Sequence, residues 1–142
     1  MSFDLKLTNG DIEISDGALV TVQNQDKLIQ DVLKILFTAT GENLAHPWYG
    51  TPMLARAIGE SANSEILSVE IADAVSFGLN NLKTLQQLQE RDSQFVTPQE
   101  LIASIDNIDA TFNQIDKRKL VVTVSIKTRS SEIITESFII RV

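Results

Sequence analysis

The chain has 142 residues and a net charge of −7 at neutral pH, with 43% hydrophobic and 22% charged residues. These values predict one globular domain over residues 1–142 and argue against a nucleic-acid binder, which needs clustered basic residues. Cysteine is absent, which excludes disulfides and thiolate sites, and neither a membrane-spanning apolar run nor a signal-peptide pattern is present, so we expect a soluble chain made in a cytoplasm.

The N-terminal segment predicts short β-strands. "FDLKL" alternates apolar and polar residues, the period of a half-buried strand. Asn-Gly at 9–10 is a strong hairpin signal because both residues tolerate positive φ. "DIEIS" then predicts a return strand with Ile12 and Ile14 inward. A second turn at 16–17 and the run "ALVTVQ" complete a predicted β-meander.

A first helix is predicted from Asn24, whose side chain suits the N-cap position, to about Thr40–Gly41, where glycine ends helices. Its apolar residues recur at helical spacing; they are Leu28, Ile29, Val32, Leu33, Ile35 and Leu36. A short second helix is predicted over 51–59, with Thr51 as its cap and Gly59 at its end.

A long third helix is predicted from Ser64 to about Glu90, because apolar residues recur there at three- and four-residue steps. Gly78 lies inside it, and the low helix propensity of glycine predicts a weak point with a kink or break. "TPQE" at 97–100 matches a capping box with proline at the first helical position, which predicts a brief helical turn.

The C-terminal part predicts a three-stranded antiparallel sheet. Two alternating tracts at 119–127 and 132–142 are joined by the turn "RSSE", and a third strand is predicted within 104–113. The side chains predicted to share one face are Leu120, Val122, Val124 and Ile126 in the first tract and Ile134, Phe138, Ile140 and Val142 in the second. The predicted fold class is therefore α+β: an N-terminal β-meander, two to three helices, and a C-terminal antiparallel sheet able to accept added strands.

The loop "GENLAHPWYG" at 41–50 contains the only Trp, Tyr and His of the chain. Trp48 and Tyr49 belong to the residue types preferred as anchors of protein–protein contacts, and Pro47 with two glycines restricts the backbone that presents them. A second interpretation is that Trp48 and Tyr49 cover the end of the domain's own core. The residues alone leave both interpretations open.

Metal-binding and catalytic interpretations of this loop have less support. Glu42 and His46 have the spacing of helical metal ligands, but Gly41 and Pro47 disfavour a helix, and no second His or Cys completes a site. His46 would also have to serve any Ser-His-Asp triad, and no GxSxG elbow presents a nucleophile. A glycosidase needs only two carboxylates, with Glu42 beside Trp48 as one candidate, so this alternative stays open.

The order of strands, helix, loop and small-residue helix carries a family resemblance. "LIQDVLKILFTATGE" followed by "HPWYG" resembles the baseplate wedge family of contractile phage tails, the sheath initiators, with relatives in type VI secretion and other contractile injection machines. In that family, a helix with an "I..iL.T..GE" ending precedes a proline–aromatic–glycine element. The matching positions here are Ile29, Leu36, Thr38, Gly41, Glu42, Pro47, Tyr49 and Gly50. The resemblance runs from the first strands to the last, with 36–50 as its specific part.

The resemblance implies a non-enzymatic structural protein of the virion tail baseplate, assembled in the host bacterial cytoplasm and without a cofactor. The implied partners are tail sheath subunits, baseplate wedge proteins and tail tube or hub proteins, but neither nucleic acid nor membrane. The first ring of sheath subunits would dock by strand addition. Because the family has also been described as lysozyme-like, a peptidoglycan-cleaving glycosidase stays an alternative, as does a strand-binding adaptor module.

The predicted protein-binding residues lie in the loop and in the C-terminal sheet. They are Gly41, Glu42, His46, Pro47, Trp48, Tyr49, Gly50, Val122, Val124, Ile134, Phe138 and Ile140. Many family members also carry a Glu-Pro-Arg tripeptide after the long helix, which helps them dock onto the helical bundle of the wedge. This chain has no such tripeptide, so docking there would use other residues.

Overall fold

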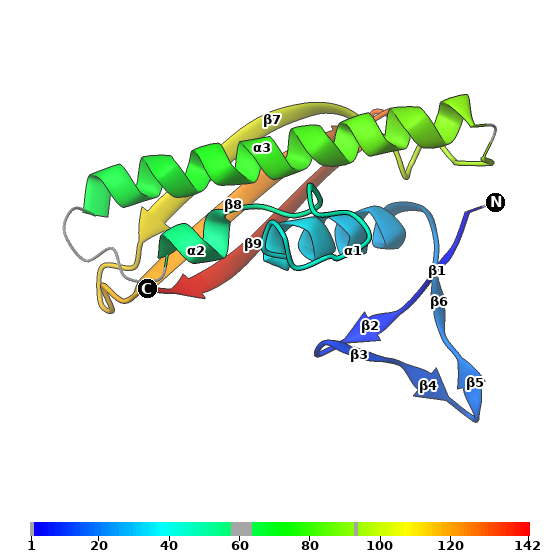
Figure 1. Cartoon of the computed structure of the whole chain (residues 1–142), viewed down its shortest axis with the longest axis horizontal. Helices are drawn as coiled ribbons and strands as arrows, with labels where there is room; N and C mark the ends of the chain where they lie inside the picture. The colour runs from blue at the N-terminus through cyan, green and yellow to red at the C-terminus, as the bar shows by residue number, and fades with distance from the viewer. Residues whose placement is uncertain (1, 58–63, 93) are drawn as a thin grey trace.

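The computed structural model of the chain describes residues 2–57, 64–92 and 94–142. A body of helices and long strands carries a small N-terminal lobe that projects beside the first helix (Figure 1). The lobe contains β1 (Asp4–Leu5), β2 (Leu7–Thr8), β3 (Asp11–Ile12), β4 (Ile14–Ser15), β5 (Ala18–Leu19) and β6 (Thr21–Val22). The body contains α1 (Asn24–Phe37), α2 (Met53–Ala57), α3 (Ser64–Arg91), β7 (Ile102–Phe112), β8 (Lys119–Thr128) and β9 (Ile133–Arg141).

The body has two layers, because α1 and α3 cover one face of the sheet β7-β8-β9 (Figure 1). Apolar side chains of the helices and of the inward strand positions fill the space between the layers, which is why one continuous core forms. The predicted α+β class and C-terminal antiparallel sheet are confirmed. Within the described ranges, no helix combines the length and the apolar character needed to cross a bilayer.

The sheet confirms the predicted alternation of β8. Leu120, Val122, Val124 and Ile126 are all buried under the helices, and β8 pairs with β9 in an unbroken antiparallel register from Lys119↔Arg141 to Lys127↔Ile133. The prediction for the last tract holds at Ile134 and Ile140, which are buried, and partly at Phe138, which is half-buried. Val142 follows the strand and is exposed.

The N-terminal lobe is built from three two-residue ladders: β2 pairs with β3, β4 with β5, and β1 closes with β6. Turns with positive φ at 9–10 and 16–17 join the first two pairs, as predicted from Asn-Gly and Asp-Gly. The ladders meet where Lys6 N–H donates to Val20 C=O, Glu13 N–H to Lys6 C=O, and Val20 N–H to Glu13 C=O. The predicted short antiparallel strands are confirmed, but they form this three-way junction instead of a meander.

The prediction that Ile12 and Ile14 point inward is wrong, since they are 45% and 65% exposed. Ladders of two residues leave no room for a covered face of their own. Polar contacts tie the lobe to α1 instead. The side-chain amide of Gln30 accepts the N–H of Leu7 and donates to the C=O of Leu5, each at 2.8 Å. Lys34 forms an ion pair with Asp4.

The start of α1 also differs from the prediction. Gln23 holds the N-cap position without a side-chain bond, and Asn24 is the first helical residue. Glu100 accepts the N–H of Asn24 at 3.4 Å, and Thr97 donates its hydroxyl to the Asn24 side-chain oxygen at 2.9 Å. The segment 97–100 forms a turn and no helix, with Glu100 N–H donating to Thr97 C=O at 3.0 Å. Its side chains hold the N-terminus of α1, where a carboxylate is favoured by the helix dipole.

The predicted end of α1 and the predicted kink of α3 are also corrected. α1 ends at Phe37, three residues before the predicted end at Thr40. The backbone of Thr38 is extended, and its C=O accepts the N–H of Thr51 at 2.9 Å. α3 runs unbroken through Gly78. A Cβ there would lie 2.3 Å from the Thr51 Cγ2, so glycine allows close packing. The predicted end at Gly59 lies outside the described residues.

Candidate interaction surfaces

The 41–50 loop leaves the end of α1 and returns to the same place. Ala39 and Thr51 form a parallel bridge that closes the loop, and the N–H of Gly41 donates to the C=O of Pro47 across it at 3.0 Å. Gly50 has φ of +106°, and a Cβ on it would lie 2.3 Å from the Thr38 carbonyl oxygen. Glycine is therefore required where the loop re-enters the body.

The side chains of the loop divide into an outer and an inner group. His46, Pro47 and Trp48 are exposed, and the Trp48 indole stands 5.5 Å from the His46 ring, between centroids. Tyr49 is half-buried and packs against the core, while Gly50 is buried. The interpretation of the loop as a core cover therefore fits Tyr49, whereas Trp48 has a surface free for contact. The predicted binding role of the loop stays a prediction.

Tyr49 and His46 line a groove of about 680 Å³ between the loop, the N-terminal segment and α3. Burial, followed by the negative charges of Asp31 and Asp4, raises the pKa of Tyr49 to about 12. The phenol is therefore neutral near pH 7. The carboxylates are neutralised by lysines: Asp4 pairs with Lys34, and Asp31 pairs with Lys27 at 2.7 Å.

The carboxylates near the loop have structural partners. Glu42 Oε2 accepts the N–H of Ala39 at 3.1 Å, which braces the start of the loop. Burial raises the pKa of Asp4, but the hydrogen bond and charge of Lys34, together with hydrogen bonds from Leu5 N–H and Gln30, outweigh burial, and the net pKa lies below its ordinary value. In the described ranges, no three His, Asp or Glu side chains converge as metal ligands do.

The predicted binding residues of the sheet lie on its helix-covered face. Val122, Val124, Ile134 and Ile140 are buried in the core, and Phe138 is half-buried, with its ring 5.2 Å from that of Phe37. Their side chains hold the sheet on α1 and α3. A partner strand on this sheet would therefore bind through the backbone of an edge strand.

The two edges of the sheet are β7 and β9, since β8 lies between them. The β7 ladder shifts register twice, between Ile102 and Ser104 and between Ile105 and Asn107, and bulges of this kind obstruct edge pairing. The β9 ladder has no register shift and contains neither proline nor lysine. Of the two predicted tracts, only the second therefore presents an edge.

The hydrogen bonds at the two ends of β9 show which backbone groups are open. Val142 N–H donates to Arg118 C=O at 2.9 Å, and Thr128 N–H donates to Glu132 C=O at 2.8 Å. Because bonded pairs alternate along an antiparallel ladder, the even positions of β9 bond to β8. The N–H and C=O groups of the odd positions point away from the sheet; these positions are Ile133, Thr135, Ser137, Ile139 and Arg141.

Comparison with known proteins gives a structural likeness. No protein-family model matches the chain, and no curated protein sequence matches it. A solved structure from Geobacter sulfurreducens, a protein provisionally named a tail lysozyme, superposes with a TM-score of 0.64 at 16% sequence identity, covering 88% of this chain and 96% of that chain. At this identity the likeness shows a shared fold.

The sequence did not predict a second groove, which lies along the outer side of α1. This α1 groove has a volume of about 820 Å³ and is lined by Lys6, Leu7, Asn9, Gly10, Val20, Thr21, Val22, Asp26, Ile29, Gln30, Leu33, Lys34 and Phe37. The one signal in the sequence was that apolar residues of α1 extend beyond a single narrow stripe. The position of the lobe over that wider stripe could not be read from the pattern.

Proposed function

We propose that the chain is a structural protein of a contractile tail baseplate, which docks the first ring of sheath subunits by strand addition and so initiates sheath assembly. The observation that carries this proposal is the continuous open edge of β9. An exposed strand edge without bulge or proline is a template on which another chain can pair. Main-chain hydrogen bonds there would provide affinity without special side chains.

The fold likeness adds support from a second direction. The protein from Geobacter sulfurreducens is named as a tail protein, and almost all of that chain superposes on this one. Together with the resemblance of residues 36–50 to the sheath-initiator family, this favours a place in a tail over a free cellular adaptor. Wedge and tube or hub proteins are the further partners we propose, with the exposed Trp48 as a contact toward one of them.

The name of that neighbour also raises the alternative of peptidoglycan cleavage. Glycosidases of the usual kind need one carboxylic acid with a raised pKa and a second carboxylate on the other side of the bond. Here the pKa of Asp4 is lowered through Lys34, and that of Glu13 is lowered through Lys6 and Thr8. Glu42 is held by the loop backbone. We therefore propose a role without catalysis.

The experiment is to assemble baseplates with and without this protein, add purified sheath subunits and tube, and view sheath growth by electron microscopy. The decisive variant is Ser137→Pro, because the N–H of Ser137 points to the open edge. Proline there removes an edge donor and leaves the β8–β9 ladder intact. We expect sheath to grow with the wild-type protein and not with Ser137→Pro.

The matched control is Ala110→Pro on β7. Asn113 N–H bonds to Lys119 C=O at 2.8 Å, so the backbone of Ala110, three positions away, points to the opposite edge. Both proline variants must show the circular dichroism and melting of the wild type. Equal sheath growth with Ser137→Pro, or growth without the protein, would overturn the proposal. Peptidoglycan clearing that is lost with Glu42→Gln would support the lytic alternative.

A further inference from the structure

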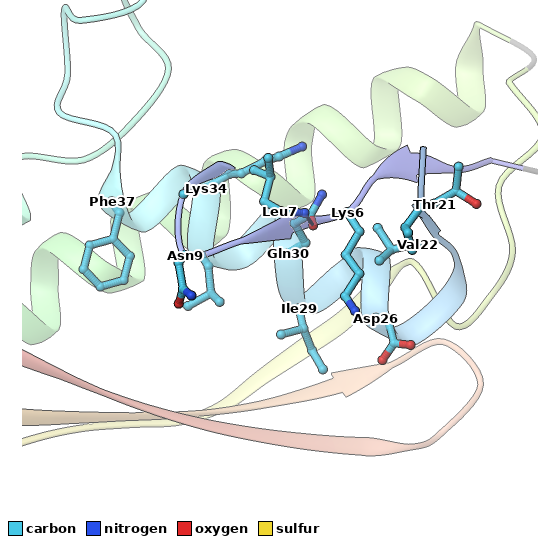
Figure 2. Close-up of a pocket in the computed structure, with 13 residues that line it drawn as sticks. Lys6, Leu7, Asn9, Thr21, Val22, Asp26, Ile29, Gln30, Lys34 and Phe37 are labelled. Carbon is cyan, nitrogen blue, oxygen red and sulfur yellow. Dashed lines mark hydrogen bonds between the residues drawn. The ribbon is translucent and has the colours of Figure 1, made fainter. Parts of the chain in front are cut away.

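The α1 groove lies between the N-terminal lobe and the outer side of α1. Figure 2 shows Ile29 pointing from α1 toward the strands of the sheet, while Lys6 and Leu7 come from the lobe strand that passes across α1. The groove volume of about 820 Å³ is within the range of about 300–1,000 Å³ that is usual for binding pockets. Phe37 is 41% exposed at one end of the groove. This space is large enough for side chains of another segment.

Two residues that line the α1 groove also meet β9. Ile29 also lines a small apolar cleft with Ile134 and Glu136 of β9, and the ring of Phe37 packs on Phe138. The opposite side of α1, with Lys27 and Asp31, faces the groove beside α3 instead. The α1 groove therefore runs along the side of α1 that faces the open edge of the sheet.

The spacing of the apolar residues in the groove suits an extended segment. Ile29, Leu33 and Phe37 follow one another at four-residue steps, which is about 6 Å along a helix. Alternate side chains on one face of a strand are about 6.6 Å apart. Where a strand paired with β9 runs along α1, the spacing of its inward side chains therefore matches that of the groove residues, with its outward side chains in solvent.

Glu136 adds a charge requirement. It belongs to the helix-covered face of β9, is half-buried, and lines the cleft beside Ile29. No lysine or arginine of the described residues forms an ion pair with it. Opposite charges on neighbouring strands stabilise their pairing. A basic residue among the inward positions of an added strand would supply this partner.

We infer that the α1 groove selects the strand that adds to β9, and that this strand has apolar residues at alternate inward positions with a lysine or arginine beside Glu136. The inference rests on the proposed strand addition and specifies its partner. Affinity comes from the open backbone of β9, as in any added strand. Specificity comes from Ile29, Leu33, Phe37 and Glu136. A strand without alternating apolar residues would not cover the three apolar side chains, and an acidic strand would not pair with Glu136.

The test measures binding of labelled peptides to the full chain by fluorescence anisotropy. The probe has nine residues, the length of β9, with valine at the inward positions, threonine between them, and lysine at the central inward position. Peptides with the same residues in scrambled order or with glutamate for the lysine are compared. We expect the scrambled and glutamate peptides to bind about tenfold more weakly or worse, which corresponds to about 1.4 kcal/mol.

Two variants separate the groove from the edge. Leu33→Gln should weaken binding of the lysine peptide about tenfold, while Leu44→Gln, the same change at a side chain that is 92% exposed and outside the groove, should not. Glu136→Lys should reverse the charge preference, so that the glutamate peptide binds better than the lysine peptide. This charge swap leaves the core side chains unchanged and keeps the test valid if Leu33→Gln fails to fold.

Each remaining outcome decides the inference. If Ser137→Pro abolishes peptide binding but Leu33→Gln and Glu136→Lys leave it unchanged, the groove inference is overturned while strand addition stands. Absence of binding by every patterned peptide also overturns the groove inference, and the sheath assay then judges the proposed function separately. If β9 edges pair two copies of this chain and the lysine peptide does not dissociate that dimer, the occupant is a second copy and the inference is overturned.

Discussion

Ile14 in the N-terminal lobe and Ile71 in α3 are the same residue type in opposite surroundings. Ile14 is 65% exposed, whereas Ile71 is completely buried between the helices and the sheet. The body derives its stability from such buried side chains, while the lobe depends on two tight turns, one ring of backbone hydrogen bonds and polar ties to α1. The body can therefore serve as a rigid base. The lobe can present apolar side chains whose substitution does not unfold the protein.

Alanine substitution of these two isoleucines should separate body and lobe most strongly in stability. Ile71→Ala should lower the free energy of unfolding by about 2–5 kcal/mol, because it removes buried methylene groups and leaves a cavity. Ile14→Ala should change it by less than about 0.5 kcal/mol. Urea unfolding followed by Trp48 fluorescence and circular dichroism measures both. Equal losses would show that the lobe is part of the same cooperative core.

The glycines of positive φ give a second pair. Gly50→Ala adds a Cβ that would lie 2.3 Å from the backbone oxygen of Thr38, whereas Gly10→Ala in the lobe has nothing within 4 Å. Both substitutions strain the backbone, but only Gly50→Ala also creates a steric clash, with the backbone of Thr38. We expect losses of about 3 kcal/mol for Gly50→Ala and about 1 kcal/mol for Gly10→Ala in urea unfolding. A reversed order would contradict the tight loop closure.

Gly78→Ala probes the packing of α3 against the residue after the loop. Overpacking against the Thr51 methyl group should outweigh the gain in helix propensity, with a net loss of about 1 kcal/mol. In a Thr51→Ser background the methyl group is gone, but the hydroxyl that bonds Leu36 C=O remains. The same Gly78→Ala change should then be neutral or stabilising. A loss that persists in the serine background would instead point to Leu36, whose Cδ2 lies 3.2 Å from the same Cβ.

The tie between lobe and body should respond to acid. The folded-state pKa of Asp4 is below its ordinary value of 3.8, so its ion pair with Lys34 stabilises the native state above that pH and is lost as the pH falls through the folded pKa. At neutral pH, Asp4→Asn should speed amide hydrogen exchange at Lys6 and Val20 by up to about fivefold, since such pairs contribute at most about 1 kcal/mol. Exchange of buried body amides, such as that of Ile71, should stay unchanged.

Tyr49 reports on the inner end of the loop without a stability change near neutral pH. Its pKa is raised to about 12 from 10.0. The stabilisation linked to this shift is therefore complete below pH 10 and is lost as the pH rises toward 12. Because Tyr49 is the only tyrosine, tyrosinate absorbance should titrate near 12 in the native protein and near 10 in urea. Asp31→Asn should lower the native midpoint, since that charge contributes after burial.

Local sequence patterns were enough to predict the elements whose signals lie within a few residues. Alternation placed β8 and β9, helical spacing placed α1 and α3, and the dipeptides at 9–10 and 16–17 placed both turns of the lobe. These patterns work because side-chain period and allowed φ are properties of a few neighbouring residues. The family resemblance at 36–50 likewise depended on residues that are close together in the chain.

Which faces and edges are open depends on how the elements pack and pair in three dimensions. The tertiary structure exposed Ile12 and Ile14 by replacing the meander with a three-way junction, and it paired β8 on both sides so that β9 became an open edge. It also brought Glu100 to the start of α1 from 76 positions away. These outcomes depend on pairings between distant segments, and a local pattern does not specify which of several compatible partners a strand or carboxylate will meet.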